Sequence, residues 1–282
     1  MKQKFVYFCL FAALSFCACK NPFGDDEISG ARKKVTGKVS VQGVDKSAGV
    51  YVWLDQINVG VFTDDDGEFA LRLPAKAASP DIEGLSGAFH LYFFTVNFRL
   101  DTARVLIRDG EFEYGKADID KNGRLRKDIM LSKTFHVVSE VSVAEVIHKG
   151  QADTIISVRT TVSAVTGIVT INIPNGTENL LGAICLRNLD TGEIQLAASG
   201  NPLNRTYTFL VPVTTSGTVL EYDLRVQAVE RQDEKYTVIP YILPTTDVPD
   251  ELYRSIGFEP DYFDTAFAKI LFDHKATVFT IL

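Results

Sequence analysis

Three oxygen-bearing side chains near the middle of this 282-residue chain have the spacing of metal ligands. Asp118, Asp120 and Asn122 occupy alternate positions before a glycine, as in the first half of a calcium-binding loop. The second half of such a loop fails, because Ile129 stands where a bidentate glutamate is needed. We therefore expect an Asx-rich turn, with weak calcium binding by these three residues as the alternative.

The sequence contains no recognisable catalytic motif. The histidines at 90, 136, 148 and 274 are widely spaced and form no close zinc pair. The chain has no GxSxG elbow, no P-loop and no glycine-rich dinucleotide fingerprint. Carboxylates are numerous, but spacing along the chain cannot show that two of them meet across a β-sandwich. The sequence therefore predicts a non-enzymatic protein without a cofactor or metal, with a cryptic hydrolase as a further alternative.

The N-terminus has the pattern of an export signal. Lys2 and Lys4 precede an apolar stretch from Phe5 to Phe16, which is too short to span a bilayer comfortably, and Ala18 offers a small residue before Cys19. The segment resembles a bacterial lipoprotein signal peptide, whose lipobox cysteine is acylated after cleavage. The resemblance implies a signal peptide over 1–18, a lipid on Cys19 and attachment to a membrane of the bacterial cell envelope, with the outer membrane favoured. An ordinary secretory cleavage or an uncleaved anchor are the alternatives.

Cleavage before Cys19 has consequences for the rest of the chain. It removes Cys9 and Cys17, so Cys185 has no disulfide partner once Cys19 is acylated, and the fold must rely on its hydrophobic core. Cys185 is expected to be a small buried apolar residue. The formal net charge of −7 becomes −9 without the two signal-peptide lysines. An acidic chain repels phosphate backbones, so nucleic acid is not an expected partner.

Two regions of different composition follow the signal. Residues 19–33 combine acidic residues with proline and glycine and lack apolar periodicity, which predicts an acidic flexible tether. From residue 34 onward, short alternating apolar runs are bounded by Gly, Asp, Asn and Pro, which is typical of strands and turns. The run from Phe89 to Val96 is almost wholly apolar and predicts a central strand covered on both faces.

Residues 34–133 carry a family resemblance. The segments VTGKV, AGVYVWL, VFTDDDGEFALRLP and LRKDIML follow one another in the order of the carboxypeptidase regulatory-like domain, and TDxDGxF at Thr63 to Phe69 is the most specific part. The resemblance implies a transthyretin-like, seven-stranded β-sandwich of Greek-key type and no activity of its own. The polar loop from Ala75 to Gly87 is longer than the family pattern, which makes it a candidate contact surface.

Residues 134–282 repeat the strand rhythm and predict a second, immunoglobulin-like sandwich by analogy. Asp190 and its neighbours form a hairpin signal, and one short helix is expected with Asp247 as its cap, Pro249 in its first turn and Gly257 at its end. The candidate strands are 134–147, 153–163, 166–173, 182–188, 192–197, 205–213, 219–230, 235–242 and 275–282.

The aromatic residues near the C-terminus bear on function. Phe258, Tyr262, Phe263 and Phe267 are expected to anchor the core or a domain interface, whereas an exposed group including Tyr253, Tyr262 and Phe263 could stack on sugars. The leading hypothesis is an all-β, membrane-anchored lipoprotein that presents its sandwiches to an envelope protein or assembly. A carbohydrate-binding surface lipoprotein is the alternative.

Overall fold

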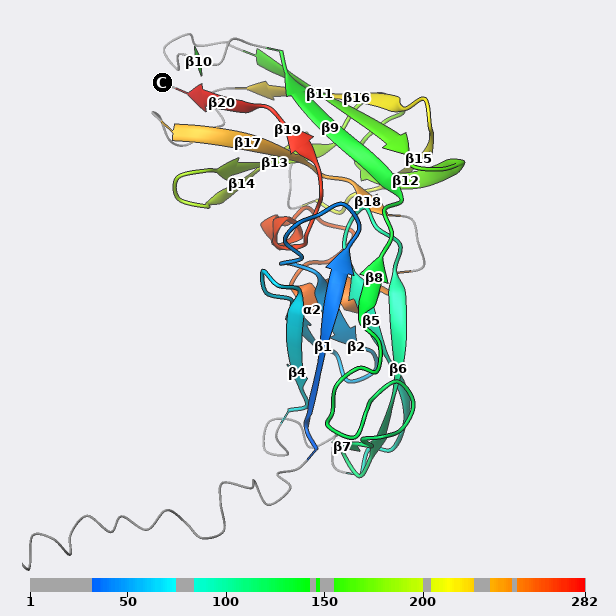
Figure 1. Ribbon diagram of the computed structural model, residues 1–282. Coiled ribbons are helices and arrows are strands. Elements are labelled where there is room, and N and C mark those ends of the chain that lie inside the picture. Colours follow the sequence, from blue (N-terminus) through cyan, green and yellow to red (C-terminus); the bar gives the residue numbers. More distant parts are fainter. Residues whose placement is uncertain are drawn as a thin grey trace, which may run out of the picture. The chain divides into compact units, whose positions relative to one another are not determined.

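Alternating buried and exposed residues form the first strand of the structure, β1 (Lys34–Val41). Val35, Gly37, Val39 and Val41 are buried, and the residues that alternate with them are partly exposed, because successive strand residues point to opposite faces. The structure is a computed structural model that describes residues 32–74, 84–142, 146–147, 155–199, 204–225, 234–244 and 248–281. The predicted all-β class is confirmed, since strands dominate and one short α-helix occurs among these residues (Figure 1).

The strands before residue 133 pair among themselves and form what we call the N-terminal sandwich. One sheet is antiparallel between β4 and β1 but parallel between β1 and β8, and the other is antiparallel throughout. In order across the sheets, the strands are β4 (Glu68–Arg72), β1 and β8 (Ile129–Leu131), then β3 (Val59–Phe62), β2 (Tyr51–Leu54), β5 (Gly87–Phe94), β6 (Asp101–Arg108) and β7 (Glu111–Phe112).

The described strands after residue 133 form three sheets, which we call the C-terminal sandwich. The hairpin predicted around Asp190 is present between β13 and β14. The three sheets contain, in order, β10 (Val146–Ile147), β20 (Val278–Ile281), β17 (Glu234–Pro240), β13 (Ala183–Asn188) and β14 (Ile194–Ala198); β16 (Thr218–Arg225), β11 (Ile155–Ala164), β9 (Phe135–Val141) and β19 (Lys275–Ala276); and β15 (Thr208–Thr214), β12 (Ile168–Pro174) and β18 (Leu243–Pro244).

The strand predicted to be covered on both faces is covered at one end. Leu91 and Phe93 of β5 belong to the core of the N-terminal sandwich, and Phe94 on the opposite face belongs to the core of the C-terminal sandwich. His90, nearer the start of β5, is exposed. The expectation of a fully covered strand was therefore wrong for the first half of β5, because the C-terminal sandwich covers this face only near the end of the strand.

The helix is α2 (Asp250–Ile256), and its two ends differ from each other. Gly257 ends it in the left-handed conformation with φ of 111°, as predicted. Its N-cap is Pro249 without a side-chain hydrogen bond, so the predicted cap at Asp247, which lies outside the described residues, was wrong. The nearby aromatic segment forms the 3-10 helix η3 (Thr265–Lys269), with the Asp264 side chain capping it.

Candidate functional site at the junction of the two sandwiches

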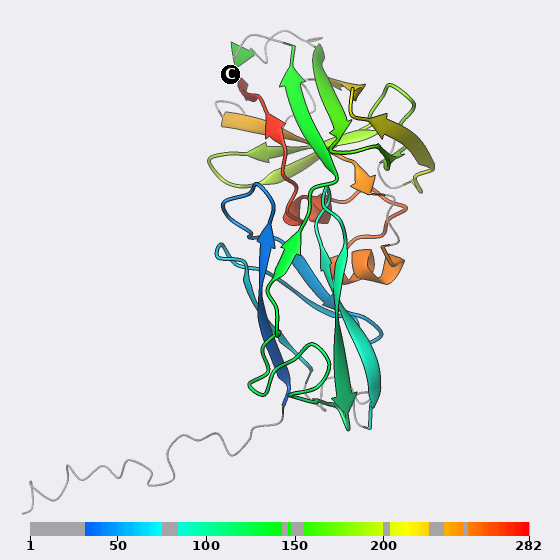
Figure 2. The ribbon, with the colours of Figure 1, turned by 45° about the vertical axis from the view of Figure 1, so that its right-hand side comes forward.

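The two sandwiches meet through one continuous hydrophobic core. Tyr51, Trp53, Phe94 and Val96 come from the N-terminal sandwich but cluster with the buried residues of the C-terminal sandwich. They reach that cluster because alternate residues of β2 and β5 point to opposite faces of the sheet. In Figure 2 the orange helix α2 and the dark red turn of η3 lie at this junction.

The apolar face of the junction consists of aromatic contacts between β2, β5 and α2. The rings of Phe94 and Tyr253 make an edge-to-face contact with centroids 5.6 Å apart. The Tyr51 hydroxyl donates a hydrogen bond of 2.9 Å to Ser255 Oγ, and burial raises the pKa of Tyr51 above its usual value. This face therefore combines apolar burial with one buried tyrosine whose hydroxyl is hydrogen-bonded.

The polar face of the junction centres on Asn97, which is fully buried. Its amide nitrogen donates to the carbonyl oxygens of Phe135, at 3.1 Å, and Asp273, at 2.8 Å. Its amide oxygen accepts from the Asp273 backbone N–H at 3.2 Å. Its backbone carbonyl accepts from Thr134, through the N–H and the hydroxyl. One side chain thus joins three segments that are distant in the sequence.

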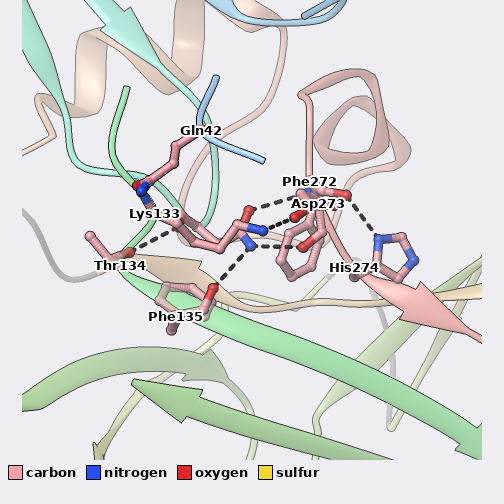
Figure 3. Close-up of polar contacts among 8 residues, drawn as sticks. Gln42, Lys133, Thr134, Phe135, Phe272, Asp273 and His274 are labelled. Carbon is pink, nitrogen blue, oxygen red and sulfur yellow. Dashed lines mark hydrogen bonds and ion pairs between the residues drawn. The ribbon is translucent and has the colours of Figure 1, made fainter. Parts of the chain in front are cut away.

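Lys133 completes this polar face beside Asn97. Its ammonium group pairs with the carboxylate of Asp273 and lies 5.3 Å from the centroid of the Phe98 ring. The lysine side chain is 13% exposed and the aspartate side chain 32%, so solvent screens this pair only in part. The Lys133 backbone N–H donates to Gln42 Oε1 at 3.2 Å (Figure 3).

His274 lies next to this cluster and is held by two backbone carbonyls. Its Nδ1 is 2.9 Å from the Phe272 oxygen, and its Nε2 is 2.9 Å from the Val238 oxygen. A neutral imidazole has one N–H and can donate to one carbonyl, whereas the doubly protonated ring donates to both. Both ring nitrogens therefore lie within hydrogen-bond distance of a backbone carbonyl.

The predicted calcium segment forms an Asx turn. Asp120 Oδ1 accepts from the backbone N–H groups of Asn122, at 2.8 Å, and Arg124, at 2.9 Å. These bonds, led by the one from Arg124, lower the pKa of Asp120. Asp118 uses its Oδ2 to accept from the Arg104 backbone N–H at 2.7 Å. The favoured turn interpretation agrees with these contacts, and weak calcium binding stays a prediction.

The acidic run in the TDxDGxF motif forms the same turn. Asp64 Oδ1 accepts from the N–H groups of Asp66 and Glu68, two and four residues later, as Asp120 does in its own turn. Gly67 takes a φ of 76°, and a Cβ there would lie 2.0 Å from the Val39 carbonyl oxygen. This aspartate is therefore engaged as a turn residue, beside the edge of β1.

The remaining titratable candidates are dispersed. His90 lies 3.6 Å from Asp55, and His136 is exposed on β9, whereas His148 is outside the described residues. Within the described part of the chain, no three His, Cys, Asp or Glu side chains are placed to hold a metal ion together. Cys185 is fully buried, and desolvation raises the pKa of its thiol to about 12, which agrees with the predicted inert packing role.

The aromatic residues proposed as a sugar platform do not share an exposed surface. Tyr253 and Phe263 are buried, and Tyr262 is 41% exposed. Phe258 and Phe267 are also buried, as expected of core anchors. Most of the 75–87 loop lies outside the described residues, as does Cys19 with the whole 1–31 segment. No helix in the part that the structure describes is long and apolar enough to cross a membrane.

Comparison with known proteins gives no family for this chain. No family model matches it, and no curated protein matches it. A solved structure titled "The Bacillus anthracis TIE protein" is similar over 76% of this chain and 29% of that longer chain, with 12% identity and a TM-score of 0.23. A likeness at that level carries no argument about this protein.

The junction residues were not identified as a site from the sequence. Asn97 gives the clearest signal, because it is a lone amide directly after the mostly apolar run LYFFTV (residues 91–96), where an unpartnered polar side chain would be costly. Lys133 and Asp273 are 140 residues apart, and nothing local connects them. They were missed because their meeting depends on how the sandwiches pack.

Proposed function

We propose that this protein is a membrane-anchored, non-enzymatic lipoprotein whose two sandwiches act as one rigid body for binding or assembling an envelope partner. The continuous hydrophobic core across the junction is the observation that supports this proposal, because a shared core resists movement of one sandwich against the other. The Asn97 contacts act in the same direction, since they fix the register of that packing.

The anchor in this proposal is a lipid on Cys19. The basic start, the apolar stretch and Ala18 support it, and the acidic segment 19–33 would then serve as a tether. Two or more acyl chains hold a protein on a membrane far more stably than one. The rigid body would be offered to a partner at a distance from the bilayer.

Recognition in this proposal uses loops and strand edges. The strand β15 lies at the edge of its sheet, and Leu210 on it is 55% exposed. An edge strand can accept a partner strand through main-chain hydrogen bonds, and neighbouring side chains then supply specificity. The division into a carboxypeptidase regulatory-like module over 34–133 and an immunoglobulin-like module over 134–282 belongs to the same proposal.

Two measurements on intact cells test the proposal. Metabolic labelling with an alkyne fatty acid should mark the wild-type protein and leave Cys19→Ala unmarked. In-cell crosslinking should then recover an envelope protein with the wild type and lose it with Cys19→Ala. Labelling that persists in Cys19→Ala would overturn the anchor. Glycan binding by residues 33–282, with no protein partner recovered, would favour the carbohydrate-binding alternative.

A further inference from the structure

A cavity of about 360 Å³ lies at the junction, on the side of His274. Its walls come from the loop before β2, from β13 and β17, and from the segment that runs from η3 to β19. Gly49 contributes the wall from the N-terminal sandwich, and Leu271 donates its backbone N–H to the Gly49 carbonyl at 2.8 Å. Pockets of this size at domain junctions are common places for small ligands.

The charged side chains of this cavity, Arg187 and Lys269, are both basic. Arg187, Lys269 and His274 line it, and none of the described residues that line it is acidic. This is unusual in a chain with a net charge of −7. Basic side chains gathered in a partly enclosed space create a local positive potential that attracts anions.

Arg187 is positioned for a ligand by its own contact. Its Nη2 donates a 2.9 Å hydrogen bond to the Ala268 carbonyl, which holds the guanidinium at the wall of the cavity. The other N–H donors of a guanidinium can then form a paired contact with a carboxylate or phosphate. Lys269 is exposed and adds a second basic group to the lining.

The rest of the cavity is apolar. Ile239, Ile270, Leu271 and Phe272 contribute to its lining. Both ring nitrogens of His274 face the carbonyls of Phe272 and Val238, so the ring offers no free nitrogen to a ligand. The cavity therefore has a cationic wall beside an apolar one.

We propose that this cavity binds a small organic anion, whose charged head lies against Arg187 and Lys269 and whose apolar body lies against Ile239 and Leu271. A carboxylate and a phosphate share the required chemistry. The proposal goes beyond the anchored-scaffold function and does not depend on the lipid, so it can be tested on residues 33–282, which form one compact unit.

The test is a binding titration followed by methyl NMR. Phenylacetate and phenyl phosphate are the anionic probes, and 2-phenylethanol is the uncharged probe of similar shape. We expect either anion to shift the methyl signals of Ile239 and Leu271 in a saturable manner, while Ile168, which is 70% exposed on β12, stays unchanged. Equal affinity for 2-phenylethanol, or no saturable shift with either anion, would overturn the proposal.

Substitutions in the cavity wall test where the charged head of the ligand binds. Lys269→Met removes an exposed side chain and should weaken anion binding about tenfold, the scale of a charge-assisted contact, without disturbing the fold. Arg187→Met should weaken it more, and circular dichroism checks that this variant still folds. Lys275→Met is the matched control, since Lys275 is exposed on β19 and does not line the cavity. An equal loss in Lys275→Met would show general charge attraction and contradict the site.

Discussion

The two faces of the junction contribute differently to the packing of the sandwiches. On the apolar face, Phe94 and Tyr253 remove aromatic surface from water, which stabilises the contact with little demand on its geometry. On the polar face, the amide nitrogen and the amide oxygen of Asn97 both hydrogen-bond to backbone groups. These bonds need one particular placement of the two sandwiches, because hydrogen bonds are directional. The difference indicates that apolar burial supplies most of the stability and that hydrogen bonding selects the arrangement.

The largest effect should come from the apolar face. Phe94→Ala empties a buried position, since Phe94 is 1% exposed, and should lower the free energy of unfolding by about 3–5 kcal/mol. Urea denaturation of the wild type and the variant measures this change. Met130→Ala is the control, because Met130 is 62% exposed and its loss should cost about 0.5 kcal/mol or less. Similar costs for the two variants would refute the division of roles.

Asn97→Leu should have the next largest effect. It leaves two buried carbonyls and one N–H without their side-chain partner, at a cost of about 2–3 kcal/mol. Amide exchange at Asp273 should also accelerate, which loss of apolar packing alone would not require. Asn172→Leu is the matched control, since Asn172 Oδ1 is buried without a partner in the described part of the chain, and it should cost less. Equal costs would remove the special role of Asn97.

Tyr51→Phe tests the one polar contact of the apolar face. Removing the hydrogen bond to Ser255 should cost about 1 kcal/mol at neutral pH. Burial raises the pKa of Tyr51, so its contribution is complete below the unfolded pKa near 10 and is lost as pH rises through the folded value. The variant should therefore lose less stability than the wild type above pH 10 in alkaline unfolding. Parallel alkaline curves would contradict this.

The smallest effect should come from the ion pair of the polar face. Lys133→Met should cost about 1 kcal/mol or less, because Asp273 remains partly in water when its partner is gone. A double-mutant cycle with Asp273→Asn, run at low salt and at high salt, measures the coupling. The exposed Lys46–Asp65 pair is the control and should show no measurable coupling. A coupling in Lys133–Asp273 that salt does not change would indicate a more deeply buried pair than the structure has.

The sequence predicted local structure well and long-range contacts poorly. The turns at Asp64 and Asp120 could be anticipated, because an aspartate followed by a glycine three residues later specifies its own hydrogen bonds. The end of α2 at Gly257 was predictable for a similar local reason. The cap at Asp247 was predicted wrongly, because the helix begins at Asp250 and Pro249, which was expected in the first turn, occupies the N-cap position itself.

The sequence by itself determined the strand rhythm, the turn chemistry, the buried role of Cys185 and the pattern that points to a lipid on Cys19. Each of these depends on residues within a few positions of one another. The tertiary structure alone decided the junction, where Asn97, Lys133 and Asp273 meet, and the cationic cavity around Arg187. The physical reason is that alternation along a strand shows which residues share a face, but not which distant face covers it.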